Sequence, residues 1–174
     1  MERSEVSKKN DILSHLSTLP EKVLSLHGID GVSQFVLHDL CNKDCFNLQK
    51  AAYIVDNPDF DCLRGVAGFS HDEAYTKQGI WTNPEQFISH MSNASFNQKV
   101  RSIDISSMRR LKKSDVEMTK FIADYVGIAK PAFCSWDMKH DNHGILVYET
   151  EQSCPIVNQY IKNGACFLGF CTVY

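Results

Sequence analysis

The sequence predicts a single α+β domain, with a mixed or antiparallel sheet packed against several amphipathic helices. Segments with the apolar spacing of helices and segments with the composition of strands follow one another without a regular alternation. The length of 174 residues suits one domain, and the hydrophobic fraction of 43% is ordinary for a globular protein. With no internal repeat or linker in view, we expect a mobile N-terminal arm at residues 1–10 and one domain over residues 11–174.

Charge and composition exclude several classes of partner. The formal net charge of -3 argues against a nucleic-acid partner. No apolar stretch approaches the length of a transmembrane helix, so no membrane partner is expected. The first eleven residues lack the apolar core of a secretory signal. A cytoplasmic location is therefore expected, in which the seven cysteines, an odd number, are free thiols.

Three helices are expected in the N-terminal quarter. Two short ones lie between Asp11 and His27, because Pro20 suits the first turn of a second helix and Gly28 suits its end. Asp30 is the predicted N-cap of the third. The apolar positions of that third helix are Val32, Phe35, Val36 and Leu40.

The stretch after this helix has two interpretations. Asp44 could cap a further helix, and the composition of residues 49–52 favours one. The alternative is a strand from Leu48 to Val55 that turns into a second strand over residues 60–69. We predict a helix that gives way to a strand near Tyr53.

Clearer signals mark the remaining elements. Gly65 and Gly68 indicate a bulge or a close backbone approach in a strand, and Asn83-Pro84 marks a helix start. A short strand is expected within residues 100–105. A capping box predicts a helix over residues 115–126. The other predicted elements are a hairpin over residues 133–149, a helix from Pro155 and a terminal strand over residues 165–174.

The turn Cys41-Asn42-Lys43-Asp44-Cys45 is the first candidate for chemistry. Thiol catalysis needs an activated cysteine, a histidine base and a third group that orients the histidine. Asp44-Cys45 at a helix start, followed much later by His143 at a strand start, resembles papain-like amidases of the NlpC type. The resemblance covers a few residues in two places and implies a cysteine hydrolase or acyltransferase with Cys45 as nucleophile and His143 as base. Candidates for the orienting residue are Asp137, Glu149 and Asn158. Alternatively, Cys45 is a small buried hydrophobe and His143 a turn residue.

A metal site is the second candidate. His38, Cys41 and Cys45 would align on one side of a single continuous helix. His140 and His143 could add nitrogen ligands, and zinc is the ion that such a set favours. Alternatively, the histidines only cap turns. No other cofactor is expected.

A basic cluster is the third candidate. It precedes the capped helix start at Ser114, where an anion or an acidic partner could bind. Its members are Arg101, Arg109, Arg110, Lys112 and Lys113. The alternative is an ordinary solvated basic run.

Residue types that act as acids, bases and ligands are thus present without a specific signature. We expect a soluble intracellular binding or regulatory protein. Its ligand would be an unknown small molecule or protein, held near the Cys/His-rich turn at residues 41–45.

Overall fold

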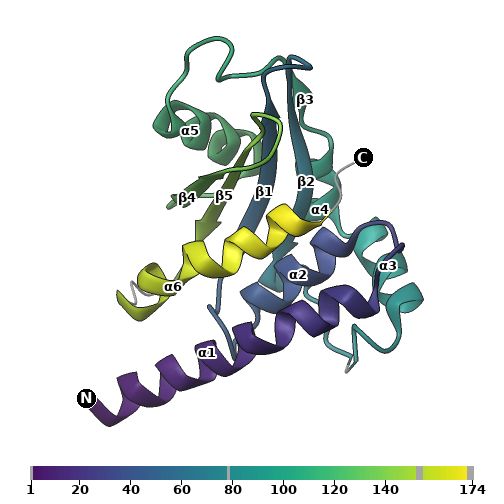
Figure 1. The fold of residues 1–174 in the computed structure, drawn as a ribbon, viewed down its shortest axis with the longest axis vertical. Helices are drawn as coiled ribbons and strands as arrows, with labels where there is room; N and C mark the ends of the chain where they lie inside the picture. Colours follow the sequence, from purple (N-terminus) through teal and green to yellow (C-terminus); the bar gives the residue numbers. More distant parts are fainter. Residues whose placement is uncertain (1, 78, 152–154, 172–174) are drawn as a thin grey trace.

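A five-stranded antiparallel sheet in the order β3-β2-β1-β5-β4 forms the centre of the protein. The computed structural model describes residues 2–77, 79–151 and 155–171 (Figure 1). The strands are β1 (Lys50–Asn57), β2 (Cys62–Ser70), β3 (Asp104–Ile105), β4 (Ala132–Asp137) and β5 (His143–Glu149). The α-helices are α1 (Glu2–Ser25), α2 (Val32–Cys41), α3 (Pro84–Asn93), α4 (Ser95–Arg101), α5 (Asp115–Val126) and α6 (Pro155–Ala165). Two short 3₁₀ helices are η1 (His71–Glu73) and η2 (Cys166–Phe170).

Helices cover both faces of the sheet, and each face has its own hydrophobic core (Figure 1). The first core lies between the sheet and the helices α1, α2, α3 and α6, with η2 at one end. The second core lies between the opposite face and the helices α4 and α5. The predicted α+β fold is confirmed.

The central strand β1 contributes to both cores. Ala51, Tyr53 and Val55 belong to the first core, whereas Ala52 and Ile54 belong to the second. A strand covered on both faces is apolar at every position, so its sequence lacks the alternation that marks a half-exposed strand. The helix predicted before Tyr53 is therefore wrong, and the alternative of two successive strands is correct.

The connection from α2 to β1 is a compact loop. α2 ends at Cys41, and the chain turns back so that Phe46 N–H donates to Leu40 O at 3.1 Å and Leu48 N–H donates to Cys41 O at 3.1 Å. Cys45 thus lies in the turn, and the continuous helix expected to align it with His38 and Cys41 is absent. At the other end of α2 the N-cap is Gly31, with φ of 80°, and not Asp30 as predicted.

The N-terminal helix is longer than predicted. α1 is continuous through Pro20, where a break between two short helices was expected. Proline inside a helix costs about 3 kcal/mol. The buried stripe formed by Ile12, Leu16 and Leu19 offsets this cost by packing in the first core. Residues 2–10, expected to be a mobile arm, form the first turns of α1 and project beyond α6 (Figure 1).

Strand β2 contains the predicted irregularity. Tyr53 pairs with Ala67 and Ile54 pairs with Gly65, so Val66 is an extra residue that forms a bulge. Gly65 and Gly68 then allow α4 to lie close against the strand, and Gly68 N–H donates to the side chain of Asn97 at 2.9 Å.

The C-terminal elements match the prediction in part. The helices α3 and α5 and the β4–β5 hairpin are confirmed, and α5 has both hydrogen bonds of its capping box. The strand expected over residues 165–174 is wrong for Cys166–Phe170, which form η2. η2 continues α6 and buries Leu168 in the first core, while residues 172–174 lie outside the described part. The strand expected within residues 100–105 is limited to Asp104–Ile105, because α4 extends to Arg101.

Replacing Gly65 by alanine tests the close approach of α4. The added Cβ would lie 1.8 Å from the carbonyl oxygen of Val100, so the helix must move away from the strand. We expect Gly65→Ala to lower the free energy of unfolding by more than about 3 kcal/mol. Gly28→Ala is the control, because its Cβ would meet no heavy atom within 4 Å and only the positive φ of 85° opposes it. The control should lose about 1 kcal/mol in urea unfolding, and equal losses in the two variants would contradict this account.

Candidate functional site

The thiols of the turn at residues 41–45 face inward. Cys41 and Cys45 are 1% and 0% exposed and belong to the first core. Burial, with a smaller contribution from the carboxylate of Asp39, raises the pKa of Cys45 to about 12. Burial and the neighbouring Cys45 raise the pKa of Cys41 as well. A nucleophilic cysteine needs the opposite shift, because the thiolate is the reactive form.

The sheet separates Cys45 from His143. Along β5, His143 shares one face with Ile145 and Val147, which belong to the second core. Cys45 belongs to the first core on the opposite face. The structure therefore does not bring together the two residues that the resemblance to NlpC-type amidases joined. The sequence also places Cys154 just before a predicted helix start at Pro155, where a thiol could be reactive, and Cys154 lies outside the described residues.

The reactivity of the thiols follows from this burial. We expect Cys45 to react with iodoacetamide near neutral pH at least about 100-fold more slowly than Cys62, which is partly exposed at the start of β2. Mass spectrometry of peptides after timed labelling measures both rates. Cys62→Ser is the control that identifies the fast site. Labelling of Cys45 first would restore the nucleophile hypothesis.

The proposed metal ligands are not grouped. His38 Nε2 accepts a hydrogen bond from the backbone N–H of Tyr75 at 3.0 Å, so the lone pair that would bind zinc is in use. Burial lowers the pKa of His38 to about 4, against the opposing effect of Asp39. Across the described residues, no three His, Cys, Asp or Glu side chains are placed to hold a metal ion. His140 is exposed in the β4–β5 turn.

The free energy of unfolding is expected to depend on pH because the pKa of His38 differs between the folded and the unfolded chain. The unfolded chain takes up a proton at His38 below pH 6.5, whereas the folded chain takes it up only near pH 4. The unfolded state therefore binds more protons between these values, and stability falls as pH falls through this window. We expect a loss of up to roughly 3 kcal/mol from this residue. Urea unfolding at several pH values should show a flatter profile for His38→Gln, which keeps an acceptor, while the exposed-site control His27→Gln should follow the wild type. A parallel loss in His38→Gln and wild type would refute the assignment.

His143 is held between two carboxylates at one end of the sheet. Its Nδ1 lies 3.1 Å from Asp137 Oδ1 and its Nε2 lies 3.1 Å from Asp115 Oδ1. Asp115 also accepts a hydrogen bond from Ser135 Oγ at 2.6 Å. Since carboxylates only accept, both contacts are hydrogen bonds only when both ring nitrogens carry a hydrogen, as in the imidazolium form. Asp137 was one of the three candidates for an orienting residue.

A third carboxylate, which is buried, lies opposite His143 on the neighbouring strand. Asp56 of β1 pairs with His143 in the sheet register and is 0% exposed. Its oxygens accept from Ser107 Oγ and from the backbone N–H of Arg109, the latter at 3.0 Å. Asp56 thereby fastens the loop between β3 and α5 to the sheet.

The basic cluster in this loop is largely paired within the protein. Arg109 lies 3.5 Å from Asp137, Arg110 lies 3.6 Å from Asp61, and Lys113 lies 3.3 Å from Glu117. These pairs are exposed and contribute little to stability. The Ser114 and Glu117 side chains already accept backbone N–H groups at the start of α5. The predicted anion site therefore gains no support from the geometry.

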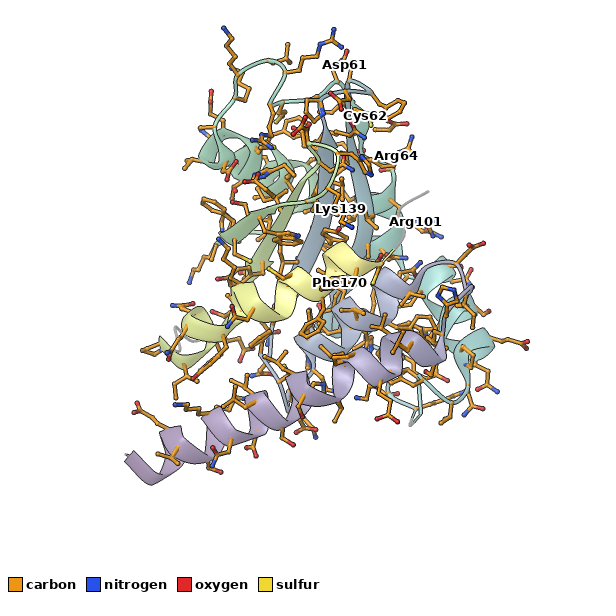
Figure 2. All side chains as sticks on the ribbon, in the orientation of Figure 1. Asp61, Cys62, Arg64, Arg101, Lys139 and Phe170 are labelled. Atoms are coloured by element: carbon orange, nitrogen blue, oxygen red, sulfur yellow. The ribbon has the colours of Figure 1, made fainter. Side chains whose placement is uncertain are left out.

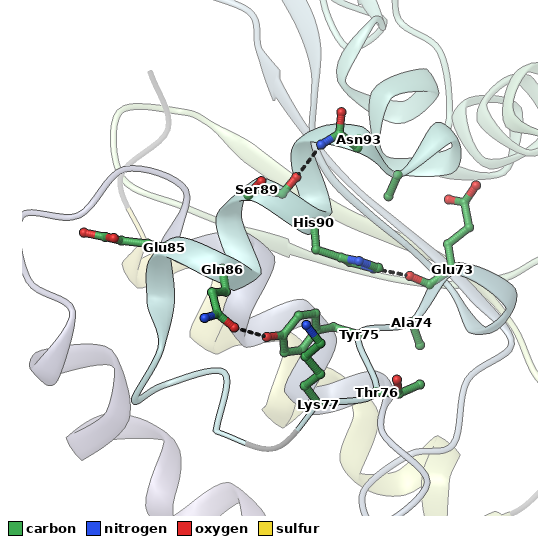
Figure 3. A pocket seen from close by; sticks show the side chains of 11 residues that line it. Glu73, Ala74, Tyr75, Thr76, Lys77, Glu85, Gln86, Ser89, His90 and Asn93 are labelled. Atoms are coloured by element: carbon green, nitrogen blue, oxygen red, sulfur yellow. Dashed lines mark hydrogen bonds between the residues drawn. The ribbon is translucent and has the colours of Figure 1, made fainter.

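Two of the hollows in the described part of the chain have slightly more polar than apolar lining. One of about 770 Å³ lies between α3 and the segment after η1 (Figure 3). There His90 Nε2 lies 2.6 Å from Glu73 O, the Glu73 carboxylate accepts from the N–H groups that begin α4, and Tyr75 donates to Gln86. Another, of about 550 Å³, lies between α1 and the turn residues Lys43 and Asp44. Hydrogen bonds within the protein thus occupy the side chains of Glu73, Tyr75, Gln86 and His90 in the first of these hollows.

The third hollow, which we name the Trp136 hollow, has a different character. It measures about 780 Å³ and lies between the β4–β5 turn and η2. Its apolar wall is formed by Val55, Trp136, Met138, Cys166, Gly169, Phe170 and Cys171. Its polar wall is formed by Asp137 at the end of β4 and by the turn residues Lys139, His140 and Asn142. Lys139 and Phe170 mark the two walls in Figure 2.

The apolar wall is supported from behind. The Trp136 ring stacks on Tyr53, with centroids 5.8 Å apart and planes inclined by 15°. Tyr53 is buried, and its hydroxyl donates to Leu168 O in η2 at 3.4 Å. The ring lies over Gly144 on the adjacent strand, where a Cβ would come within 2.5 Å of it. Trp136 Nε1 and Asn142 Oδ1 lie beneath the surface of the hollow and have no hydrogen-bond partner among the described residues.

The sequence alone did not reveal this hollow. Its polar wall was predicted as a hairpin turn, but its other wall is η2, which was predicted as a strand. Phe170, with 78% of its side chain exposed at the rim, has no sequence signal that separates it from a core residue.

Comparison with known proteins does not assign the chain to a family. The chain matches no protein-family model, no curated protein and no solved structure. No helix in the described part of the chain has both the length and the apolar character needed to cross a membrane.

Proposed function

We propose that this protein is a binding protein whose ligand is a small molecule with an apolar body, held in the Trp136 hollow. The observation that carries the proposal is the combination of one aromatic and aliphatic wall with one polar wall around about 780 Å³. Small-molecule sites typically have this volume and this composition, with a few polar groups that fix the orientation of the ligand.

The unpaired polar atoms of the wall support a ligand with polar groups. A buried donor or acceptor without a partner costs about 1–3 kcal/mol. Trp136 Nε1 is such a donor and Asn142 Oδ1 such an acceptor. Both lie just beneath the surface, so a small shift of the wall brings them within reach of a ligand that carries an acceptor and a donor.

We also propose that the protein is located in a reducing compartment, such as the cytoplasm. The cysteines in the described part of the chain are free thiols, and Cys166 and Cys171 line the hollow. The proposal keeps the class of function expected from the sequence and moves the site away from residues 41–45, because those thiols are buried.

Binding is testable with an apolar dye. In a Trp81→Phe variant, Trp136 is the remaining tryptophan, and titration with 8-anilinonaphthalene-1-sulfonate should quench its fluorescence saturably. Phe170→Ser removes an exposed ring from the rim and should weaken binding about fivefold. Leu24→Ser is the matched control, because Leu24 is 72% exposed and lies outside the hollow.

Three outcomes would count against the proposal. They are the absence of saturable quenching, equal weakening by Phe170→Ser and Leu24→Ser, and a changed urea midpoint in Phe170→Ser that accounts for its weaker binding.

A further inference from the structure

We infer that His143 is a proton-operated latch for the Trp136 hollow, which holds the β4–β5 turn in place while the imidazole is protonated and releases it when the proton is lost. The effect on ligand binding rests on the proposed function of the hollow. The movement of the turn does not depend on that function.

The two carboxylates make the contacts of His143 depend on its proton. Asp115 and Asp137 each place an oxygen 3.1 Å from a different ring nitrogen. A neutral imidazole has one N–H and one lone pair. After deprotonation, one carboxylate oxygen therefore faces a lone pair, and one of the two contacts has to open.

Asp137 is the partner that gives way. Asp115 is fixed by its second hydrogen bond, from Ser135 Oγ at 2.6 Å, and by its place in the first turn of α5. The Asp137 side chain is 81% exposed, and its other contact is the exposed Arg109 at 3.5 Å. Water can replace these contacts of Asp137 at little cost, whereas the Asp115 side chain is only 34% exposed and keeps its hydrogen bond from Ser135.

Asp137 connects the latch to the hollow. It is the last residue of β4, and the turn that follows it forms the polar wall. The turn is closed by the Met138 N–H, which donates to Asn142 O at 2.8 Å. His140 and Asp141 in this turn have φ of 60° and 53°, a conformation that non-glycine residues adopt at a cost. Release of Asp137 therefore leaves a strained turn with one fewer anchor.

The other charges around His143 are few. Three carboxylates surround it: Asp56 lies opposite it on β1, Asp115 on α5 and Asp137 on β4. The nearby cation is Arg109 in the loop before α5, which contacts Asp137. His140 is the other histidine in this hairpin and has no contact with these carboxylates among those described.

Amide hydrogen exchange tests the latch directly. We expect the protection factor of the Met138 amide to fall about tenfold or more as the pH is raised and the imidazole loses its proton. His143→Gln should remove this pH dependence. His140→Gln is the matched control in the same turn and should keep it. A protection factor that is constant in the wild type, or that falls equally in His143→Gln, would overturn the inference.

Asp137→Asn keeps the test decisive if His143→Gln folds poorly. The amide of asparagine can accept from an N–H or donate to a lone pair, so it suits either form of the imidazole. The protection factor should then no longer depend on pH. Asp137 is largely exposed, so the variant should fold. Retention of the wild-type pH dependence in this variant would refute the role of Asp137.

Titration with 8-anilinonaphthalene-1-sulfonate at the low and the high pH of the exchange experiment tests the effect on the hollow. We expect weaker binding at the higher pH in wild type and in His27→Gln, whose exposed side chain lies outside the hollow, but not in Asp137→Asn. Absence of dye binding at every pH would count against the proposed function, while the exchange data would still decide the latch. If the dye affinity does not depend on pH while the protection factor of the Met138 amide does, the regulatory part of the inference is overturned.

Discussion

The structure depends on the burial of β1 between two cores. Its odd-numbered residues from Ala51 to Val55 pack under α2 and η2, and its even-numbered residues pack under α4 and α5. Both neighbouring strands pair with it along nearly its whole length. A strand in this position cannot shift by one residue without exchanging its two sets of side chains. The ends of β1 therefore fix where the hairpin, Asp56 and the loop before α5 lie.

The sequence correctly predicted those elements whose ends are defined by hydrogen bonds between neighbouring residues. The capping box of α5 and the hairpin turn over residues 139–142 were readable because short-range hydrogen bonds define them. Three features could not be predicted from local sequence: the strand β1, the continuation of α1 through Pro20 and the helical form of residues 166–170. In each of these, contacts with distant segments outweigh the local preference.

The candidate site was predictable as residue types but not as an arrangement. His143 and Asp137 were named from the sequence, and they do contact each other. The pairing of His143 with Cys45 failed because the sequence did not show on which face of the sheet each residue lies. The face of His143 follows from the register of β5, and Cys45 lies in a loop whose path depends on the packing of Phe46 against Gly164.

The bulge at Val66 also determines which changes of length β2 can accept. Leu63 before the bulge belongs to the second core, whereas Ala67 and Phe69 after it belong to the first, although all three have odd numbers. Because of the extra residue, the odd-numbered side chains of β2 lie on opposite faces of the sheet before and after the bulge. A one-residue deletion there would move the side chains on one side of the bulge from one core to the other. β2 should therefore accept conservative replacements of side chains far more readily than any insertion or deletion between Leu63 and Ala67.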